Sequence, residues 1–249
     1  MSGRLDGRVA LVTGAGQGIG RGTALALARE GAVIALAGRT VAKCESVAAE
    51  IAELGSKAIA ISCEVGDRAQ VDHAVARTVE AFGGIDILVN NAQTSVQAKL
   101  EDTTDEDVEL AWRSGSLATL YAMQAVLPHM RARGGGSIVN FGSSTAIEGN
   151  VAFGSYAMAK EAIRGLSRVA SREWGPYGIR VNVIVPNALS PASMEFRDAH
   201  PERFARAMAR VPLGRVGDPE TDIGRAVVAL AAEDLTFLTG QTLMMTGGA

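Results

Sequence analysis

The sequence predicts an α/β protein with one doubly wound parallel sheet of about seven strands and helices on both faces. Short apolar runs alternate along the chain with longer segments of helical spacing. The runs ILVN (87–90) and VNVIV (181–185) are apolar on both faces, as expected of parallel strands that helices cover on each side. The first run leads directly into the glycine-rich stretch TGAGQGIG (13–20). Right-handed crossovers would join these elements into such a sheet.

The expected elements follow in chain order from the apolar runs and from the segments rich in Ala, Leu, Glu and Arg between them. We expect strands at Val9–Thr13, Val33–Ala37, Ala58–Cys63, Ile85–Asn90, Ser137–Phe141, Arg180–Val185 and near Leu243–Met245. Helices are expected over segments such as Gly20–Glu30, Val41–Leu54 and Arg68–Phe82.

A single domain over residues 1–249 fits the length and the 47% hydrophobic content of the chain. The least regular stretch is Pro186–Val211, which holds three of the 7 prolines. We expect a mobile substrate flap near 187–211.

Composition narrows the possible partners and the compartment. A net charge of −3 and a pI near 5.7 give no sign of a nucleic-acid footprint. No apolar run reaches the ~18 residues that span a bilayer, and the polar N-terminus does not resemble a secretory signal. Cys44 and Cys63 lack metal-ligand spacing, so we interpret them as reduced and structural. We expect a cytoplasmic protein without a metal, a membrane partner or a nucleic acid.

The glycine-rich turn lies between an apolar strand and a helix, which is the context of a dinucleotide site. Gly14 allows the tight turn, Gly18 lets the backbone approach a pyrophosphate, and Gly20 lets the helix pack closely on the strand. The helix N-terminus then presents N–H groups to the phosphates. A ligand-free turn is the alternative, because the spacing is G-x-x-x-G-x-G.

The end of the second strand predicts the type of cofactor. A carboxylate there would bind a ribose 2′-hydroxyl, but Gly38 leaves this position empty and Arg39 follows. A guanidinium matches a phosphate in charge and geometry, which favours NADP(H) over NAD(H). A solvated surface arginine is the alternative, since Gln17 adds no second cation in the glycine turn.

Tyr156 and Lys160 are four residues apart on one helix face. An ammonium close to a phenol stabilises phenolate, so Lys160 is expected to lower the pKa of Tyr156 and make it an acid or base near neutral pH. Ser143 follows the fifth strand, where a parallel strand opens toward the ligand crevice, and its hydroxyl would hydrogen-bond a substrate carbonyl. A helix surface and a cap residue are the alternatives.

Together these motifs resemble the short-chain dehydrogenase/reductase family, and 3-oxoacyl-carrier-protein reductases among its members. The resemblance rests on TGAGQGIG, LVNNAQ, the serine, YAMAK, VNVIVPN and GQTLMMTGG. It implies a Rossmann-type domain, a homotetramer, and hydride transfer between NAD(P)H and a carbonyl or alcohol. The family's catalytic serine, tyrosine and lysine fall on Ser143, Tyr156 and Lys160. By the same resemblance Lys160 binds the nicotinamide ribose, and further cofactor contacts fall on Gln17, Ile19, Glu64, Val65, Asn91 and Leu189.

Three positions depart from the family pattern. Gln93 replaces the glycine of NNAG, and Asn187 replaces the glycine after Pro186. Gly115 lies where the family has its fourth catalytic residue, an asparagine. We expect an active enzyme, because the family uses the backbone carbonyl of that asparagine, which glycine retains. A degenerate member that binds cofactor without turnover, and a scaffold protein, are the alternatives.

The substrate pocket is expected from Gln93–Val96, Thr145–Phe153 and Asn187–Arg210. Its apolar side chains favour an apolar ketone or alcohol over a sugar or phosphate, with packing as the alternative; they are Thr145, Ala146, Ile147, Val151, Phe153, Met194 and Phe196.

Overall fold

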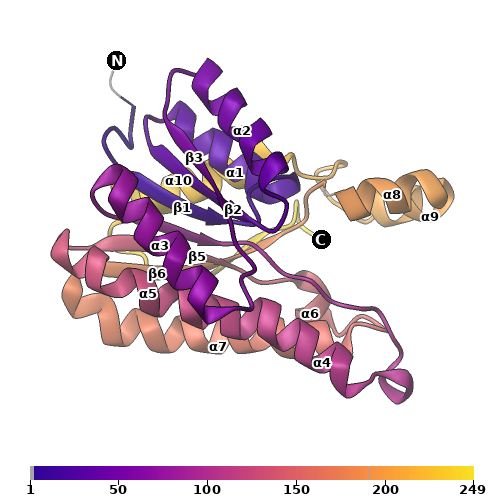
Figure 1. The fold of residues 1–249 in the computed structure, drawn as a ribbon. Helices are drawn as coiled ribbons and strands as arrows, with labels where there is room; N and C mark the ends of the chain where they lie inside the picture. The colour runs from indigo at the N-terminus through magenta and orange to yellow at the C-terminus, as the bar shows by residue number, and fades with distance from the viewer. Residues whose placement is uncertain (1–2, 190) are drawn as a thin grey trace.

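The computed structural model describes residues 3–189 and 191–249, which form one parallel sheet of seven strands with helices on both faces (Figure 1). The strand order is β3-β2-β1-β4-β5-β6-β7. The strands are β1 Val9–Thr13, β2 Val33–Gly38, β3 Ala58–Ser62, β4 Ile87–Asn90, β5 Gly136–Phe141, β6 Ile179–Pro186 and β7 Thr242–Met245. The predicted doubly wound sheet is confirmed, and each expected strand agrees with an observed one to within two residues at either end.

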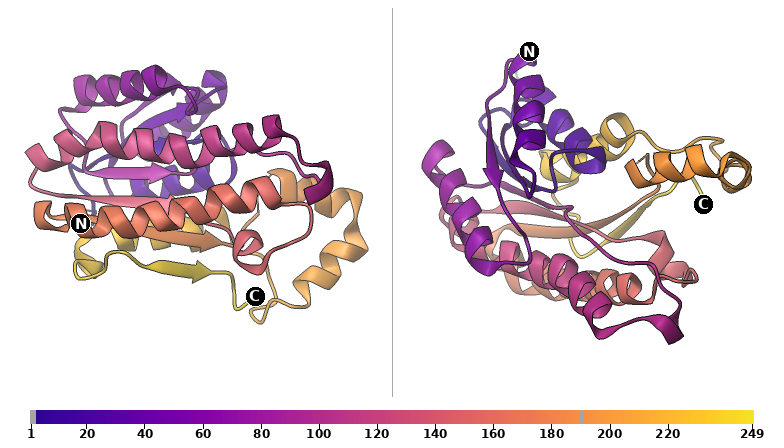
Figure 2. Two further views of the ribbon diagram at one scale, coloured as in Figure 1. Left: turned by 90° about the horizontal axis from the view of Figure 1, so that it is seen from below. Right: turned by 45° about the vertical axis from the view of Figure 1, so that its right-hand side comes forward.

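One face of the sheet is covered by α1 (Gly18–Arg29), α2 (Val41–Glu53) and α10 (Arg225–Ala231). The other face is covered by α3 (Arg68–Phe82), α5 (Ala118–Ala132) and α7 (Gly154–Trp174), which run side by side in Figure 2. Each face has its own apolar core, because the strands carry buried side chains on both sides.

The strand order reverses between β1 and β4, which lie next to each other at the centre of the sheet although they are not consecutive in the chain. In doubly wound sheets, ligands bind outside the carboxyl ends of the strands at such a switch point. The glycine turn follows β1, Asn91 follows β4 and Ser143 follows β5, so all three reach the same edge.

The helix before β5 is interrupted. It begins as α4 (Asp105–Trp112), continues as a π turn (Arg113–Leu117) and resumes as α5. A π turn inserts one residue into an α-helix and often lies at a functional site. Gly115 is the middle residue of this turn and is buried.

The flap is more regular than expected. It carries two helices, α8 (Pro191–Ala199) and α9 (Pro201–Met208), which project from the body of the protein beyond the strand ends (Figures 1 and 2). Each helix begins with a proline, and proline is favoured at a first helical position because its missing N–H needs no partner there. The segment is therefore helical where the sequence suggested its least regular stretch, and its role as a mobile substrate flap stays a prediction.

Short elements complete the chain: the 3₁₀ turns Leu100–Asp102, Gly175–Tyr177 and Glu233–Leu235, the helix α6 (Ser144–Glu148) and the π turn η4 (Pro219–Gly224). Cys44 and Cys63 are buried free cysteines, as predicted. Over residues 3–189 and 191–249, we find no helix with the length and apolar character needed to cross a membrane.

Candidate active site

The glycine turn has the geometry that its sequence predicts. Gly14 and Gly18 have φ angles of +63° and +54°, and a residue with a side chain adopts such angles only at a steric cost. A Cβ on Gly20 would lie 2.2 Å from the carbonyl oxygen of Gly14, so only glycine allows this close contact between helix and turn. The three proposed roles of these glycines are consistent with the structure.

A groove of about 420 Å³ lies over this turn. It is lined by the predicted cofactor residues Gly14, Gln17, Gly18, Ile19, Arg39, Glu64, Val65 and Asn91, together with Thr40, Lys43, Gln93, Thr94 and Ser114 among others. The N-terminus of α1 borders the groove at Gly18, where backbone N–H groups and the helix dipole favour phosphate. These residues fit the pyrophosphate and adenosine of a dinucleotide.

Gly20, Leu189 and the pair Tyr156 and Lys160, which are also predicted to contact the cofactor, are not part of this lining. The pair is described below. Gly20 packs beneath the turn, as described above. Leu189 lies at the base of the flap, where its N–H donates to the carbonyl of Gly217 at 3.0 Å. Its backbone donor is therefore already bonded within the chain.

Two cations lie at the adenosine end of the groove. The guanidinium of Arg39 donates to Thr94 Oγ1 at 3.2 Å and lies 3.8 Å from a carboxylate oxygen of Glu64. Lys43 lies one turn into α2, and its Nζ donates to Gln17 Oε1 at 2.6 Å. The sequence interpretation considered the glycine turn alone and missed Lys43. The signal was a second basic residue in the first turn of the helix that follows Arg39.

Asn91 ties the end of β4 to the glycine turn. Its Nδ2 donates to the carbonyls of Thr13 and Gly14 at 3.0 and 3.1 Å, while its N–H donates to Thr13 Oγ1 at 3.0 Å. The amide thus holds the two loops of the switch point together beside the groove, in agreement with its expected place next to the cofactor.

Ser143, Tyr156 and Lys160 come together beyond the groove. Ser143 lies two residues after β5, and the other two lie one turn apart at the start of α7. The Ser143 hydroxyl lies close enough to the Tyr156 phenol to affect its pKa. Lys160 is 5% exposed, and its Nζ donates to the carbonyl of Phe141 at 2.8 Å. The three predicted catalytic residues therefore form one cluster at the carboxyl end of β5.

The expected effect of Lys160 on the tyrosine is not found. Burial raises the pKa of Tyr156 above its usual value, and the nearby Ser143 hydroxyl only opposes this shift. The Nζ of Lys160 lies 5.6 Å from the centroid of the Tyr156 ring, and burial lowers the pKa of the lysine to about 7. A lysine that is itself difficult to charge provides little stabilisation of a phenolate.

The mouth of the site is apolar. The loop after β4 joins the loop before α7 through a bridge between Ala98 and Phe153, and the Phe153 ring lies edge-on to Tyr156 with centroids 6.0 Å apart. Exposed apolar side chains surround this bridge: Val96, Leu100, Ile147 and Val151. Met194 on the flap is also exposed, whereas the side chain of Phe196 lies outside the described part of the structure.

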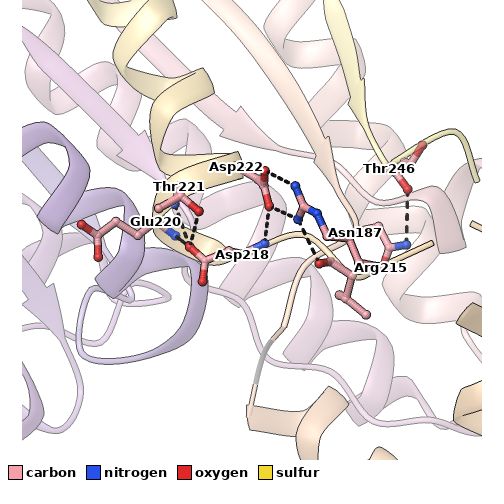
Figure 3. A network of polar contacts seen from close by, with 8 residues as sticks. Asn187, Arg215, Asp218, Glu220, Thr221, Asp222 and Thr246 are labelled. Carbon is pink, nitrogen blue, oxygen red and sulfur yellow. Dashed lines mark hydrogen bonds and ion pairs between the residues drawn. The ribbon is translucent and has the colours of Figure 1, made fainter. Parts of the chain in front are cut away.

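The base of the flap is held by a polar network (Figure 3). Asn187 Nδ2 donates to the carbonyl of Thr246 at 3.4 Å, and its carbonyl accepts from Gly217 N at 2.9 Å. Arg215 pairs with Asp222 through Nη2 and Oδ1 at 2.8 Å, and this pairing holds the pKa of the carboxyl at about 2. Asn187 in place of glycine thus adds an anchor to the C-terminal segment.

Comparison with known proteins agrees with this geometry. The family model described as enoyl-(acyl carrier protein) reductase matches residues 14–249. The chain is 41% identical to a 12α-hydroxysteroid dehydrogenase of Clostridium sp., over 99% of this chain and 98% of that protein. It is 33% identical to a 3-oxoacyl-[acyl-carrier-protein] reductase of Thermotoga maritima, over 98% of each chain.

A solved structure has the same fold. It is a 7α-hydroxysteroid dehydrogenase complexed with NADH and 7-oxo glycochenodeoxycholic acid, with a TM-score of 0.92 at 31% identity, covering 99% of this chain and 95% of that one. An NAD⁺-bound xylitol dehydrogenase gives a TM-score of 0.92 at 32% identity, over 98% of this chain and 99% of that one.

The fold and these relatives define the chain as a nicotinamide-dependent oxidoreductase that acts on alcohol or carbonyl groups. It belongs to the short-chain dehydrogenase/reductase family.

Proposed function

We propose that this protein transfers hydride between NADP(H) and an apolar secondary alcohol or ketone. The observation that carries the proposal is the cluster of Ser143, Tyr156 and Lys160 at the carboxyl end of β5, beside a groove that fits a dinucleotide. When bound, the nicotinamide supplies or accepts the hydride.

The side chains of the cluster then handle the proton. On reduction, the Tyr156 phenol donates its proton to the carbonyl oxygen, and on oxidation the phenolate accepts the proton of the alcohol. Ser143, whose hydroxyl lies beside the Tyr156 phenol, holds the substrate oxygen. Lys160 binds the nicotinamide ribose. Because burial raises the pKa of Tyr156, the phenol is protonated at neutral pH, the form that a reduction consumes.

The preference for NADP(H) rests on charge. Arg39 and Lys43 both line the adenosine end of the groove, where a 2′-phosphate would pair with them. Glu64 opposes this preference, since its carboxylate lies 3.8 Å from the Arg39 guanidinium. The two solved structures named above carry NADH or NAD⁺, so the cofactor preference of this chain depends on its own cations.

The substrate class rests on the mouth of the site. Val96, Leu100, Ile147 and Val151 present exposed apolar surface around the bridge between Ala98 and Phe153. Such a surface suits an apolar ring system better than a sugar, and two of the similar proteins are named as hydroxysteroid dehydrogenases. We therefore propose a hydroxysteroid or another alicyclic alcohol as the substrate.

A substrate screen tests this proposal. The protein is mixed with NADPH or NADH and with oxosteroids, cyclohexanone derivatives, sugars and 3-oxoacyl thioesters, and the absorbance is followed at about 340 nm. We expect turnover with the apolar ketones and NADPH. Turnover with sugars only would overturn the substrate class. If the protein binds NADPH, as measured by fluorescence titration, but turns over no substrate, the degenerate alternative would be favoured. The comparisons provide no support for that alternative.

Assembly and compartment complete the proposal. A homotetramer in the cytoplasm is what the family resemblance implies, and exposed apolar side chains on the edge strand β7 and nearby, Met244 and Phe237, are consistent with an interface. Light scattering of the purified protein measures the oligomeric state.

A further inference from the structure

The departures at positions 93 and 115 form one spatial relationship. Gln93 follows β4 and Gly115 is the centre of the π turn, and their separation in sequence hides the contact between them. A Cβ built on Gly115 would lie 2.8 Å from Nε2 and 2.9 Å from Cδ of Gln93. The amide of Gln93 therefore occupies the space that any side chain at position 115 would enter.

The amide itself is buried and unsatisfied. Within residues 3–189 and 191–249, neither Nε2 nor Oε1 of Gln93 has a hydrogen-bond partner, and both atoms are inaccessible to solvent. Buried polar groups are nearly always hydrogen-bonded, since an unmet donor or acceptor costs free energy. An amide with two unmet ends therefore points to a partner that is not part of this chain.

The surroundings of the amide are fixed and polar. Ser114 Oγ donates to the carbonyl of Thr94 at 2.8 Å and accepts from its N–H at 3.1 Å, which ties the loop of Gln93 to the π turn. Ser116 Oγ donates to the carbonyl of Ala159 at 3.1 Å, which ties the same turn to α7. Ala159 directly precedes Lys160, so the turn connects Gln93 to the segment that carries the buried lysine.

We propose that Gln93 is a positioning residue of the active site. Its amide fills the space left by Gly115 and binds a hydroxyl group, of an internal water or of the cofactor ribose, beside the turn that is bonded to the Lys160 segment. Gly115 is the matching partner, because only a residue without a side chain leaves room for the amide. This inference rests on the function proposed above.

Measurements that do not require turnover test whether Gln93 and a side chain at position 115 compete for the same space. Gly115→Asn places a side chain against the amide, Gln93→Gly removes the amide, and the double variant removes the conflict. We expect Gly115→Asn alone to lower both Tm and NADPH affinity, and Gln93→Gly to restore Tm in the double variant. NADPH affinity recovers with it where the amide binds water, and stays low where the amide binds the ribose. Losses in Tm that simply add in the double variant would overturn the pairing, whether or not the protein is an enzyme.

The hydrogen-bonding role is tested with Gln93→Met, which keeps the length of the side chain and removes its polar group. Because the amide is unsatisfied in the chain alone, we expect Tm to remain equal or to rise. We expect kcat to fall at least about tenfold, with a shifted pH–rate profile. The matched control is Gln97→Met, an exposed glutamine on the same loop, which should change neither quantity.

The outcomes separate the possibilities. A shifted pH profile with unchanged NADPH affinity assigns the bound hydroxyl to water, and a weaker affinity assigns it to the ribose. If Gln93→Met keeps the wild-type kcat, pH profile and affinity, the amide only fills space and the inference is wrong. Wild-type protein without turnover on any substrate would instead overturn the proposed function, and the Tm and affinity cycle would still judge the pairing.

Discussion

Lys160 donates a hydrogen bond of 2.8 Å to the carbonyl oxygen of Phe141, the last residue of β5. This bond anchors α7 to the strand that leads into Ser143. It also holds the ammonium 5.6 Å from the centroid of the Tyr156 ring, in a site where the lysine is almost fully buried. The position of Lys160 thus disfavours its own charge.

This burial predicts a pH-dependent stability. Burial lowers the pKa of Lys160 to about 7 from 10.5, so below pH 7 both the folded and the unfolded chain carry the charge, and its full desolvation penalty acts on the folded state. The penalty decreases as pH rises from about 7 and is absent above the unfolded pKa. Lys160→Met removes it, a change of about 5 kcal/mol below pH 7 at 1.36 kcal/mol per pKa unit.

We expect the Tm of cofactor-free Lys160→Met to exceed that of wild type most below pH 7, with the difference decreasing toward pH 10.5. Thermal unfolding across this range, with matched buffers, measures it. A difference that is independent of pH would show that folding does not shift the pKa of Lys160. Turnover and NADPH binding should both fall in the variant, since the lysine is assigned to the ribose.

Tyr156→Phe tests the proton transfer. The phenyl ring keeps the packing against Phe153, and the variant loses only the hydroxyl beside Ser143. We expect turnover to fall by about 10²–10⁴-fold, while NADPH binding stays within about threefold of wild type. Steady-state rates and fluorescence titration measure the two effects. Retention of more than a tenth of the rate would assign the proton to another group.

The cofactor preference is tested at the adenosine end of the groove. Arg39→Ala and Lys43→Ala should each weaken NADPH binding by about tenfold to a hundredfold and leave NADH binding nearly unchanged, because a charge-assisted pair with phosphate contributes roughly 1.5–3 kcal/mol. Glu64→Gln removes the carboxylate beside Arg39 and should strengthen NADPH binding. Parallel titrations with both cofactors give the ratios, and equal changes for the two cofactors would contradict a 2′-phosphate site.

The ion pair between the buried Asp86 and Arg133 should contribute to stability. Asp86 is 3% exposed and accepts from Arg133 Nε and Nη2 at 2.9 and 2.8 Å and from Val9 N at 2.8 Å. Arg133→Met leaves this carboxylate without its main partner, so we expect a loss of about 2–4 kcal/mol in the free energy of unfolding. Denaturant titration measures it.

The matched control is Arg77→Met, which removes an exposed pair with Glu80 on α3. Exposed pairs contribute about 0–1 kcal/mol, so this variant should unfold close to wild type. Similar losses in both variants would mean that the burial of Asp86 has no special effect.

Much of the architecture was predictable because it depends on local pattern. Apolar runs with helical segments between them identified all seven strands, and the glycines of the turn identified the dinucleotide groove. The two helices near 191–208 were not predicted, because prolines begin helices as well as interrupt them. Spacing alone also placed Tyr156 and Lys160 on one helix face.

The sequence by itself determined the fold class and the residues that gather at the strand ends, since periodicity and strand order depend on neighbours along the chain. Only the tertiary structure decided their environments. Burial opposes a charge on both Tyr156 and Lys160, and so overturns the expected pKa shift of the phenol. Contacts across the fold bring Lys43 against Gln17, and Gln93 into the space of Gly115. Desolvation and packing depend on residues distant in sequence, so no local pattern contains them.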